Sequence, residues 1–124
     1  MNATLRTLPI QEDRSRGERC CDPTTPRLDD AQVAGLAADF DILANPIRVR
    51  LLDLLASNGG KVCVCDLEAA VPVKQPTVSH HLKLLRHAGL IDWEKRGLWS
   101  YYFINTDAVR ALRARIVDAL TAYA

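Results

Sequence analysis

Apolar residues in the first half of this chain recur at intervals of three and four, the spacing of one helix face. The first such stripe is made of Val33, Leu36, Ala37 and Phe40. Asp29 or Asp30 precedes it and can cap the first turn of a helix. The pattern therefore predicts an amphipathic helix that begins near residue 30.

A second helix is predicted after Asn45-Pro46, because proline is favourable in the first turn of a helix. Asn58-Gly59-Gly60 marks its end. Its apolar positions are Ile47, Val49, Leu51, Leu52, Leu54 and Leu55. This helix is apolar over most of its surface, which predicts that it is deeply buried.

Two shorter elements and a third long helix follow. Residues 61–65 are partly β-branched and predict a small strand or an extended lead-in. We expect Asp66 to cap a short helix that Pro72 stops. Residues 75–87 predict the next helix, with Pro76 in its first turn and Gly89 just after its end. Its inward positions are Val78, Leu82 and Leu85.

The period then changes, which predicts a β-hairpin over residues 91–104. Its strand-forming residues are Trp93, Trp99, Tyr101, Tyr102 and Phe103. The segment Lys95-Arg96-Gly97 lies at the centre and predicts a turn with a basic tip. Thr106 or Asp107 can cap a last helix. The apolar stripe of that helix is Val109, Leu112, Ile116, Leu120 and Tyr123.

This order of elements predicts a mainly α (α+β) fold. A short helix, a turn and a second helix make a helix-turn-helix, and the hairpin after it makes a wing. The first and last helices have apolar faces without an evident partner in one chain, so we expect dimerisation through them. Residues 1–27 are expected to form a flexible N-terminal arm, and residues 28–124 the DNA-binding and dimerisation domain.

Composition and charge restrict the function classes. The chain has 124 residues, 48% of them hydrophobic, which suits one domain with an ordinary core. No apolar run is long enough for a membrane span or a signal peptide, so we expect a cytoplasmic protein. The net charge of +1 is no argument for nucleic acid, although residues 74–96 carry a modest local basic excess.

The helix over residues 75–87 is the candidate DNA reader. The N-terminal part of the second helix of a helix-turn-helix reads base edges. There Gln75 suits adenine, and Thr77, Ser79 and His80 suit bases or phosphate. Lys83, Lys95 and Arg96 are the candidate cationic contacts to the backbone. On periodicity alone, these side chains fit a solvated helix face equally well.

Four cysteines form two pairs, Cys20-Cys21 and Cys63-x-Cys65. Residues two apart face opposite ways in a helix but the same way in an extended stretch. A short strand that leads into a helix therefore makes joint ligation of one soft ion by Cys63 and Cys65 feasible. The helix start is expected to lower the thiol pKa. Buried structural thiols, and an incidental exposed pair at Cys20-Cys21, are the alternative interpretations.

The run QPTVSHHLKLLRHAGL, residues 75–90, resembles the signature of the ArsR/SmtB family of metal-responsive repressors. LANPIRVRLLDLL, residues 43–55, is similar to the second helix of that family, and the wing also fits. Pro76 stands where relatives often have a small hydroxyl residue. The resemblance implies a homodimeric repressor that binds an inverted repeat in double-stranded operator DNA.

VCVCDL, residues 62–67, resembles the metalloid-binding motif of the arsenic-responsive members. Those often have a third cysteine where this chain has Glu68, so we expect Cys20 and Cys21 to complete the set, from the same chain or its partner. The resemblance implies that arsenite or antimonite, As(III) or Sb(III), is the inducer that releases the DNA. A methylated arsenical is a further possibility for the ligand.

Two other signals use the same thiols. Four thiolates suit a tetrahedral soft cation such as cadmium or lead, and a thiol-redox response is the other alternative. An enzyme is not expected, because the chain has no phosphate loop, no nucleophile with a positioned base and no paired carboxylates.

Overall fold

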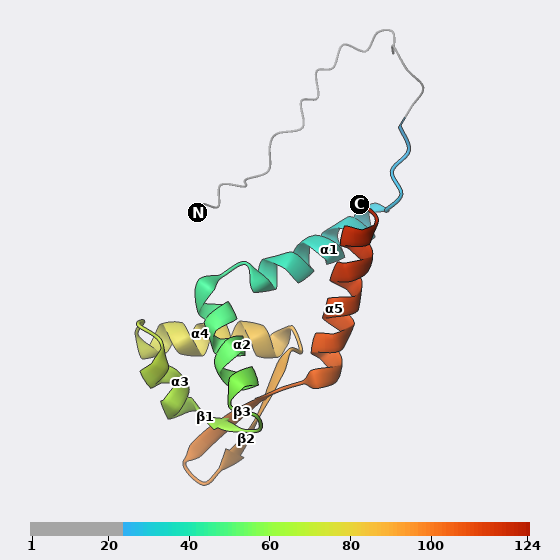
Figure 1. Cartoon of the computed structure of the whole chain (residues 1–124). Coiled ribbons are helices and arrows are strands. Elements are labelled where there is room, and N and C mark those ends of the chain that lie inside the picture. The colour runs from blue at the N-terminus through green and yellow to red at the C-terminus, as the bar shows by residue number, and fades with distance from the viewer. Residues whose placement is uncertain (1–23) are drawn as a thin grey trace.

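The computed structural model describes residues 24–124. Its elements in chain order are α1 (Asp30–Leu43), α2 (Pro46–Ser57), β1 (Val62–Cys63), α3 (Val64–Ala70), α4 (Gln75–His87), β2 (Ile91–Arg96), β3 (Trp99–Ile104) and α5 (Thr106–Thr121). This order confirms the predicted mainly α fold with a helix-turn-helix, α3–α4, and a wing, β2–β3. Figure 1 shows the wing at the end of the molecule opposite α1 and the C-terminus.

Side-chain caps fix where α1, α2 and α5 begin. Asp29 accepts a hydrogen bond from the backbone N–H of Gln32 at 2.8 Å, and the Gln32 side chain accepts one from the Asp29 N–H at 2.9 Å. Asn45 caps α2, as its position before Pro46 suggests. The cap of α5 is Asn105, so the prediction of Thr106 or Asp107 is wrong by one or two residues. The Asn105 side-chain oxygen reaches the free N–H of Ala108, which satisfies one of the four unpaired donors of the first turn.

The start of α3 also differs from the prediction. Cys63 is the N-cap residue, and Asp66 lies inside the first turn instead of capping it. The reason is the strand before it: Val62 and Cys63 pair with Tyr102 and Tyr101 of β3, and the chain enters the helix directly after this pairing.

The three strands form one antiparallel sheet in the order β1-β3-β2. Arg96 pairs with Trp99, so the hairpin turn consists of Gly97 and Leu98. The predicted turn at Lys95-Arg96-Gly97 is therefore placed too early, and Lys95 and Arg96 belong to β2. Gly97 has φ 61°, which a two-residue turn requires at its first position and which glycine adopts without strain.

One hydrophobic core joins α2, α3, α4, the hairpin and α5. Its buried side chains are Leu51, Leu55, Leu67, Val71, Val78, Leu82, Leu85, Leu90, Ile91 and Leu112. The three inward positions predicted for α4 are all among them. The core thus fixes which face of α4 remains outside.

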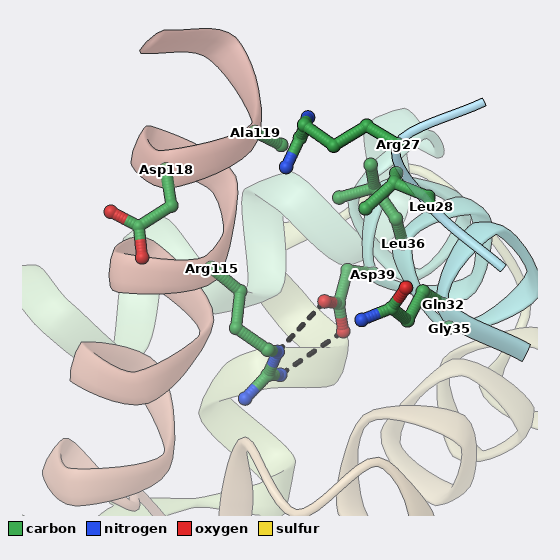
Figure 2. A pocket seen from close by; sticks show the side chains of 9 residues that line it. All are labelled: Arg27, Leu28, Gln32, Gly35, Leu36, Asp39, Arg115, Asp118 and Ala119. Carbon is green, nitrogen blue, oxygen red and sulfur yellow. Dashed lines mark hydrogen bonds and ion pairs between the residues drawn. The ribbon is translucent and has the colours of Figure 1, made fainter. Parts of the chain in front are cut away.

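Helices α1 and α5 pack against each other but leave much apolar surface uncovered. Arg115 of α5 donates two hydrogen bonds to the Asp39 carboxylate of α1, at 2.8 and 3.0 Å (Figure 2). A cavity of about 440 Å³ lies beside this ion pair. The exposed large apolar side chains of the two helices are Val33, Phe40, Val117 and Leu120, and Tyr123 just after α5 adds another. Within residues 24–124, no helix is long and apolar enough to cross a membrane.

Candidate DNA interface and cysteine site

The exposed face of α4 carries every side chain predicted to read DNA from this helix. These exposed residues are Gln75, Thr77, Ser79, His80 and Lys83. The opposite face is buried, because Val78 and Leu85 have no exposed surface and Leu82 has almost none. The core therefore presents a polar helix face to solvent, and the base contacts of these residues stay a prediction.

Arg48 holds α4 in place, a role that was not predicted from the sequence. It is the only buried charged residue in the described part of the chain, with 8% of its surface exposed. Its guanidinium donates to the carbonyl oxygens of Ile42 and Asp41 at 2.8 Å each, and to Nδ1 of His81 at 3.3 Å. The signal was its spacing: residues 48, 51 and 55 share one face of α2, so this arginine lies on the buried stripe.

His81 faces inward from α4, and its Nδ1 contacts the Arg48 guanidinium. Burial lowers the pKa of His81, and the positive charge of Arg48 and then that of His80 lower it further. Because arginine has only donors, Nδ1 of His81 must accept in this contact. Protonation of His81 would remove the acceptor and place two cations together.

We therefore expect the free energy of unfolding to decrease in acid, because His81 takes up a proton more readily in the unfolded chain. The pKa of the folded state lies below the usual 6.5, so the unfolded chain takes up the proton first as pH decreases. Stability is complete above about pH 6.5 and is lost as pH falls from there through the folded pKa. Denaturant unfolding at fixed protein concentration between pH 5 and 8 measures it, and His81→Gln should flatten the profile. His87→Gln, at an exposed position on the same helix, should keep the wild-type profile. Equal profiles for the two variants would contradict this.

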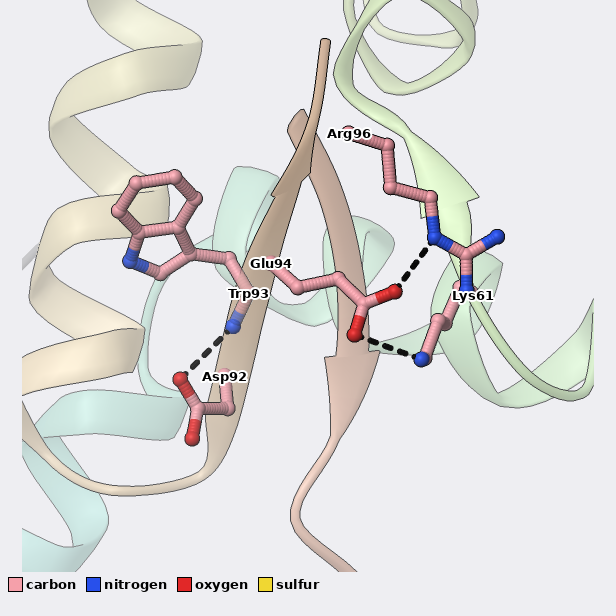
Figure 3. Close-up of polar contacts among 5 residues, drawn as sticks. All are labelled: Lys61, Asp92, Trp93, Glu94 and Arg96. Atoms are coloured by element: carbon pink, nitrogen blue, oxygen red, sulfur yellow. Dashed lines mark hydrogen bonds and ion pairs between the residues drawn. The ribbon is translucent and has the colours of Figure 1, made fainter. Parts of the chain in front are cut away.

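The wing cation Arg96 is paired within the chain. Its Nε lies 2.6 Å from Oε1 of Glu94, and Nζ of Lys61 lies 2.7 Å from Oε2 of the same carboxylate (Figure 3). Hydrogen bonds from Lys61 and then from Arg96 lower the pKa of the Glu94 carboxyl. Lys61 and Glu94 were not singled out in the sequence, because only the pairing of β1 and β2 with β3 brings them together.

Cys63 and Cys65 lie together, as the strand-to-helix spacing predicts. Cys63 ends β1 and is half-buried, whereas Cys65 is exposed in the first turn of α3. Their sulfur atoms are 2.8 Å apart, and the Cys65 thiol donates to Cys63. Two thiols can therefore approach the same small ion.

The expected lowering of the thiol pKa at this helix start is wrong for Cys65. Its pKa is raised, first by the hydrogen bond to Cys63, which holds the proton, and then by desolvation. The negative charge of Asp66 adds to the increase. The local interactions therefore outweigh the partial charge of this short helix.

Cys20 and Cys21, the other predicted ligands, lie outside the described residues. Within residues 24–124, no three histidine, cysteine, aspartate or glutamate side chains gather closely enough to hold a metal ion. The described chain thus offers two thiol ligands, which fit part of a three-thiolate arsenic site and part of a four-thiolate site.

Known proteins are similar to this chain in sequence. Residues 45–92 match the family described as "Bacterial regulatory protein, arsR family". An uncharacterized HTH-type transcriptional regulator of Methanocaldococcus jannaschii is 40% identical over 65% of this chain and 89% of its own length. The arsenical resistance operon repressor of Escherichia coli is 42% identical over 64% and 66%. A Staphylococcus aureus homolog of the cadmium resistance regulatory protein CadC is 32% identical over 62% and 63%.

Solved structures have the same architecture. A possible transcriptional regulator for arsenical resistance superposes with a TM-score of 0.59 and 33% identity, over 70% of this chain and 96% of that one. A homodimeric winged helix-turn-helix DNA-binding domain from Mycobacterium bovis gives 0.55 and 30%, over 77% and 90%. With its fold, its family match and relatives that are transcriptional regulators, this chain belongs to the arsR family of bacterial regulatory proteins and is a winged-helix transcriptional repressor.

Proposed function

We propose that this repressor binds operator DNA as a homodimer and releases it when trivalent arsenic or antimony binds its cysteine thiolates. The observation that carries the proposal is the 2.8 Å approach of the Cys63 and Cys65 sulfur atoms at the start of the helix-turn-helix. Cys20 and Cys21, on the proposed arm of residues 1–27, complete the ligand set from the same chain or from its partner.

The chemistry at the thiols is ligand exchange without a change of oxidation state. For each thiol that binds arsenite, one As–S bond forms and one As–O bond breaks. The thiol proton leaves with the hydroxide as water. Soft thiolates suit this ion better than the carboxylate of Glu68.

The homodimer is proposed to form through α1 and α5. Val33 and Phe40 on α1, Val117 and Leu120 on α5, and Tyr123 just after α5 expose apolar surface that a second copy would bury. The related M. bovis domain is homodimeric. A symmetric dimer presents two α4 helices to two half-sites of an inverted repeat, about one helical turn of DNA apart.

Base and phosphate contacts are proposed to divide between α4 and the wing. Gln75, Thr77, Ser79 and His80 would read base edges or phosphate near the start of α4. Lys83, Lys95 and Arg96 would contact the phosphate backbone, which supplies much of the affinity and makes it salt-dependent.

The ligand would act on α3, which leads into the reading helix. Two thiolates at the zinc–thiolate bond length of about 2.3 Å lie about 3.8 Å apart at a tetrahedral ion and somewhat closer at a pyramidal one, in both cases wider than the 2.8 Å between the free thiols. Binding therefore has to move Cys63 at the end of β1, Cys65 in α3, or both. A coupling of about 1–3 kcal/mol would weaken operator binding roughly 5- to 150-fold.

A soft divalent cation such as cadmium or lead is the second candidate inducer. The S. aureus relative is named for cadmium resistance, and four thiolates suit a tetrahedral cation. A thiol-redox response is the third, since Cys63 and Cys65 lie within reach of each other.

Fluorescence anisotropy of labelled DNA from upstream of the gene tests the proposal. We expect reduced protein to bind with two chains per site and to leave the DNA on addition of arsenite or antimonite. Release by cadmium alone would support a soft divalent cation as the inducer. Release by peroxide that a reductant reverses would support the thiol-redox response. Absence of DNA binding would refute the repressor mechanism proposed here.

A further inference from the structure

Lys61, next to the cysteine strand β1, and Arg96, next to the wing tip, share one counter-ion, the Glu94 carboxylate. Each oxygen of the Glu94 carboxylate takes one of them: Oε1 lies 2.6 Å from Arg96, and Oε2 lies 2.7 Å from Lys61 (Figure 3). The three side chains together carry a net charge of +1, where the two cations alone would carry +2. All three are partly exposed, so a phosphate could reach the same cations.

The sheet holds these groups on one face. Tyr101 of β3 is the pairing partner of both Glu94 on β2 and Cys63 on β1. Directly opposed residues of neighbouring strands project to the same face. Arg96 lies over the Tyr101 ring at 5.5 Å, and Lys61 over the Phe103 ring at 5.5 Å. The aromatic rings therefore keep both cations beside the carboxylate.

From this geometry we propose that Glu94 is a positioning residue that competes with DNA phosphate for Arg96 and Lys61. Its carboxylate occupies the place that a phosphate oxygen would take on each cation, and so limits what the wing contributes to DNA affinity. Exposed ion pairs of this kind are weak, so DNA can displace the carboxylate. The negative charge of Glu94 nevertheless stays close to the phosphate. This inference rests on the proposed DNA binding.

The chain offers a matched control for the charge. Asp92 lies on the same strand as Glu94, and its carboxylate accepts a hydrogen bond from the N–H of Trp93 at 2.8 Å (Figure 3). None of the described cations forms an ion pair with Asp92 within 4.0 Å. Glu94→Gln and Asp92→Asn remove the same charge from β2, but only the first releases Arg96 and Lys61.

The test is binding of the full chain to a labelled 30-base-pair duplex at several salt concentrations. Glu94→Gln should tighten binding roughly three- to tenfold near 0.1 M salt, and steepen log K against log salt by about 1 for each wing. Asp92→Asn should change affinity less than about twofold. Equal tightening by both variants would reduce the effect to net charge and overturn the proposal, as would unchanged or weaker binding by Glu94→Gln.

A double-mutant cycle with Arg96→Gln separates competition from a change in wing folding. If Glu94 acts through Arg96, Glu94→Gln should tighten binding less in the Arg96→Gln background than in the wild type. An equal effect in both backgrounds would contradict the proposal. If the wild-type chain binds no duplex at all, the proposed function itself fails. If the wild type binds the duplex but Glu94→Gln leaves the affinity unchanged, only the proposed role of Glu94 is overturned.

Discussion

Replacing Cys63 or Cys65 with serine should leave DNA binding intact and abolish its release by arsenite. The wild type should lose affinity roughly 5- to 150-fold on addition of the ion, whereas each variant should change less than about twofold. Serine is nearly isosteric with cysteine, but its hydroxyl is not a ligand for a soft ion. Anisotropy titrations of the operator complex with arsenite measure the effect.

The cysteine pair at residues 20 and 21 provides the comparison. Cys20→Ser with Cys21→Ser should also weaken the arsenite response, because the proposed site draws its remaining thiolate from this pair. Full release in the Cys63→Ser and Cys65→Ser variants would refute the site. Full release in the Cys20→Ser/Cys21→Ser variant alone would restrict the site to Cys63 and Cys65.

The second large effect is expected at Arg48. Arg48→Met should lower the free energy of unfolding by about 2–3 kcal/mol, because the part-buried carbonyl of Ile42 loses its donor and His81 loses its partner. The variant should also weaken DNA binding, since α4 is no longer tied to the end of α1. Denaturant unfolding at one fixed protein concentration measures the stability change, because dimerisation makes apparent stability concentration-dependent.

Arg50 is the matched control for this substitution. It lies two residues further along α2, with 61% of its side chain exposed, and pairs with Asp53, which is 56% exposed. Arg50→Met should change stability by no more than about 0.5 kcal/mol. Similar losses for the two variants, or a stable Arg48→Met protein, would show that the hydrogen bonds of Arg48 do not hold these helices together.

The bounds and faces of α4 were predictable because the signals are local. Pro76 favours the first turn, and Gly89, with φ 81°, lies just past the end. Val78, Leu82 and Leu85 recur at intervals of four and three, which sets one buried stripe and leaves the polar face outside. The joint approach of Cys63 and Cys65 followed from the same kind of reasoning, since a strand end and a helix start place residues i and i+2 differently from a regular helix.

Boundaries were predicted less well where competing signals are adjacent. Asn105, Thr106 and Asp107 are all good capping residues, and the end of β3 decides that Asn105 is the cap. In the hairpin, the pairing of Arg96 with Trp99 places the turn at Gly97 and Leu98. The pKa of Cys65 is raised, whereas a lowered pKa was predicted, because its hydrogen bond to Cys63 outweighs the partial positive charge at the start of a seven-residue helix.

The sequence by itself determined the order of elements, the inward face of α4 and the resemblance that names the family, because these depend on residues close together in the chain. Only the tertiary structure decided that Arg48 bonds the end of α1 and His81, 33 positions away. It also decided that Lys61, Glu94 and Arg96 form one cluster. Such contacts depend on how strands and helices pack across long sequence separations, and the period of a single element carries no record of its partners.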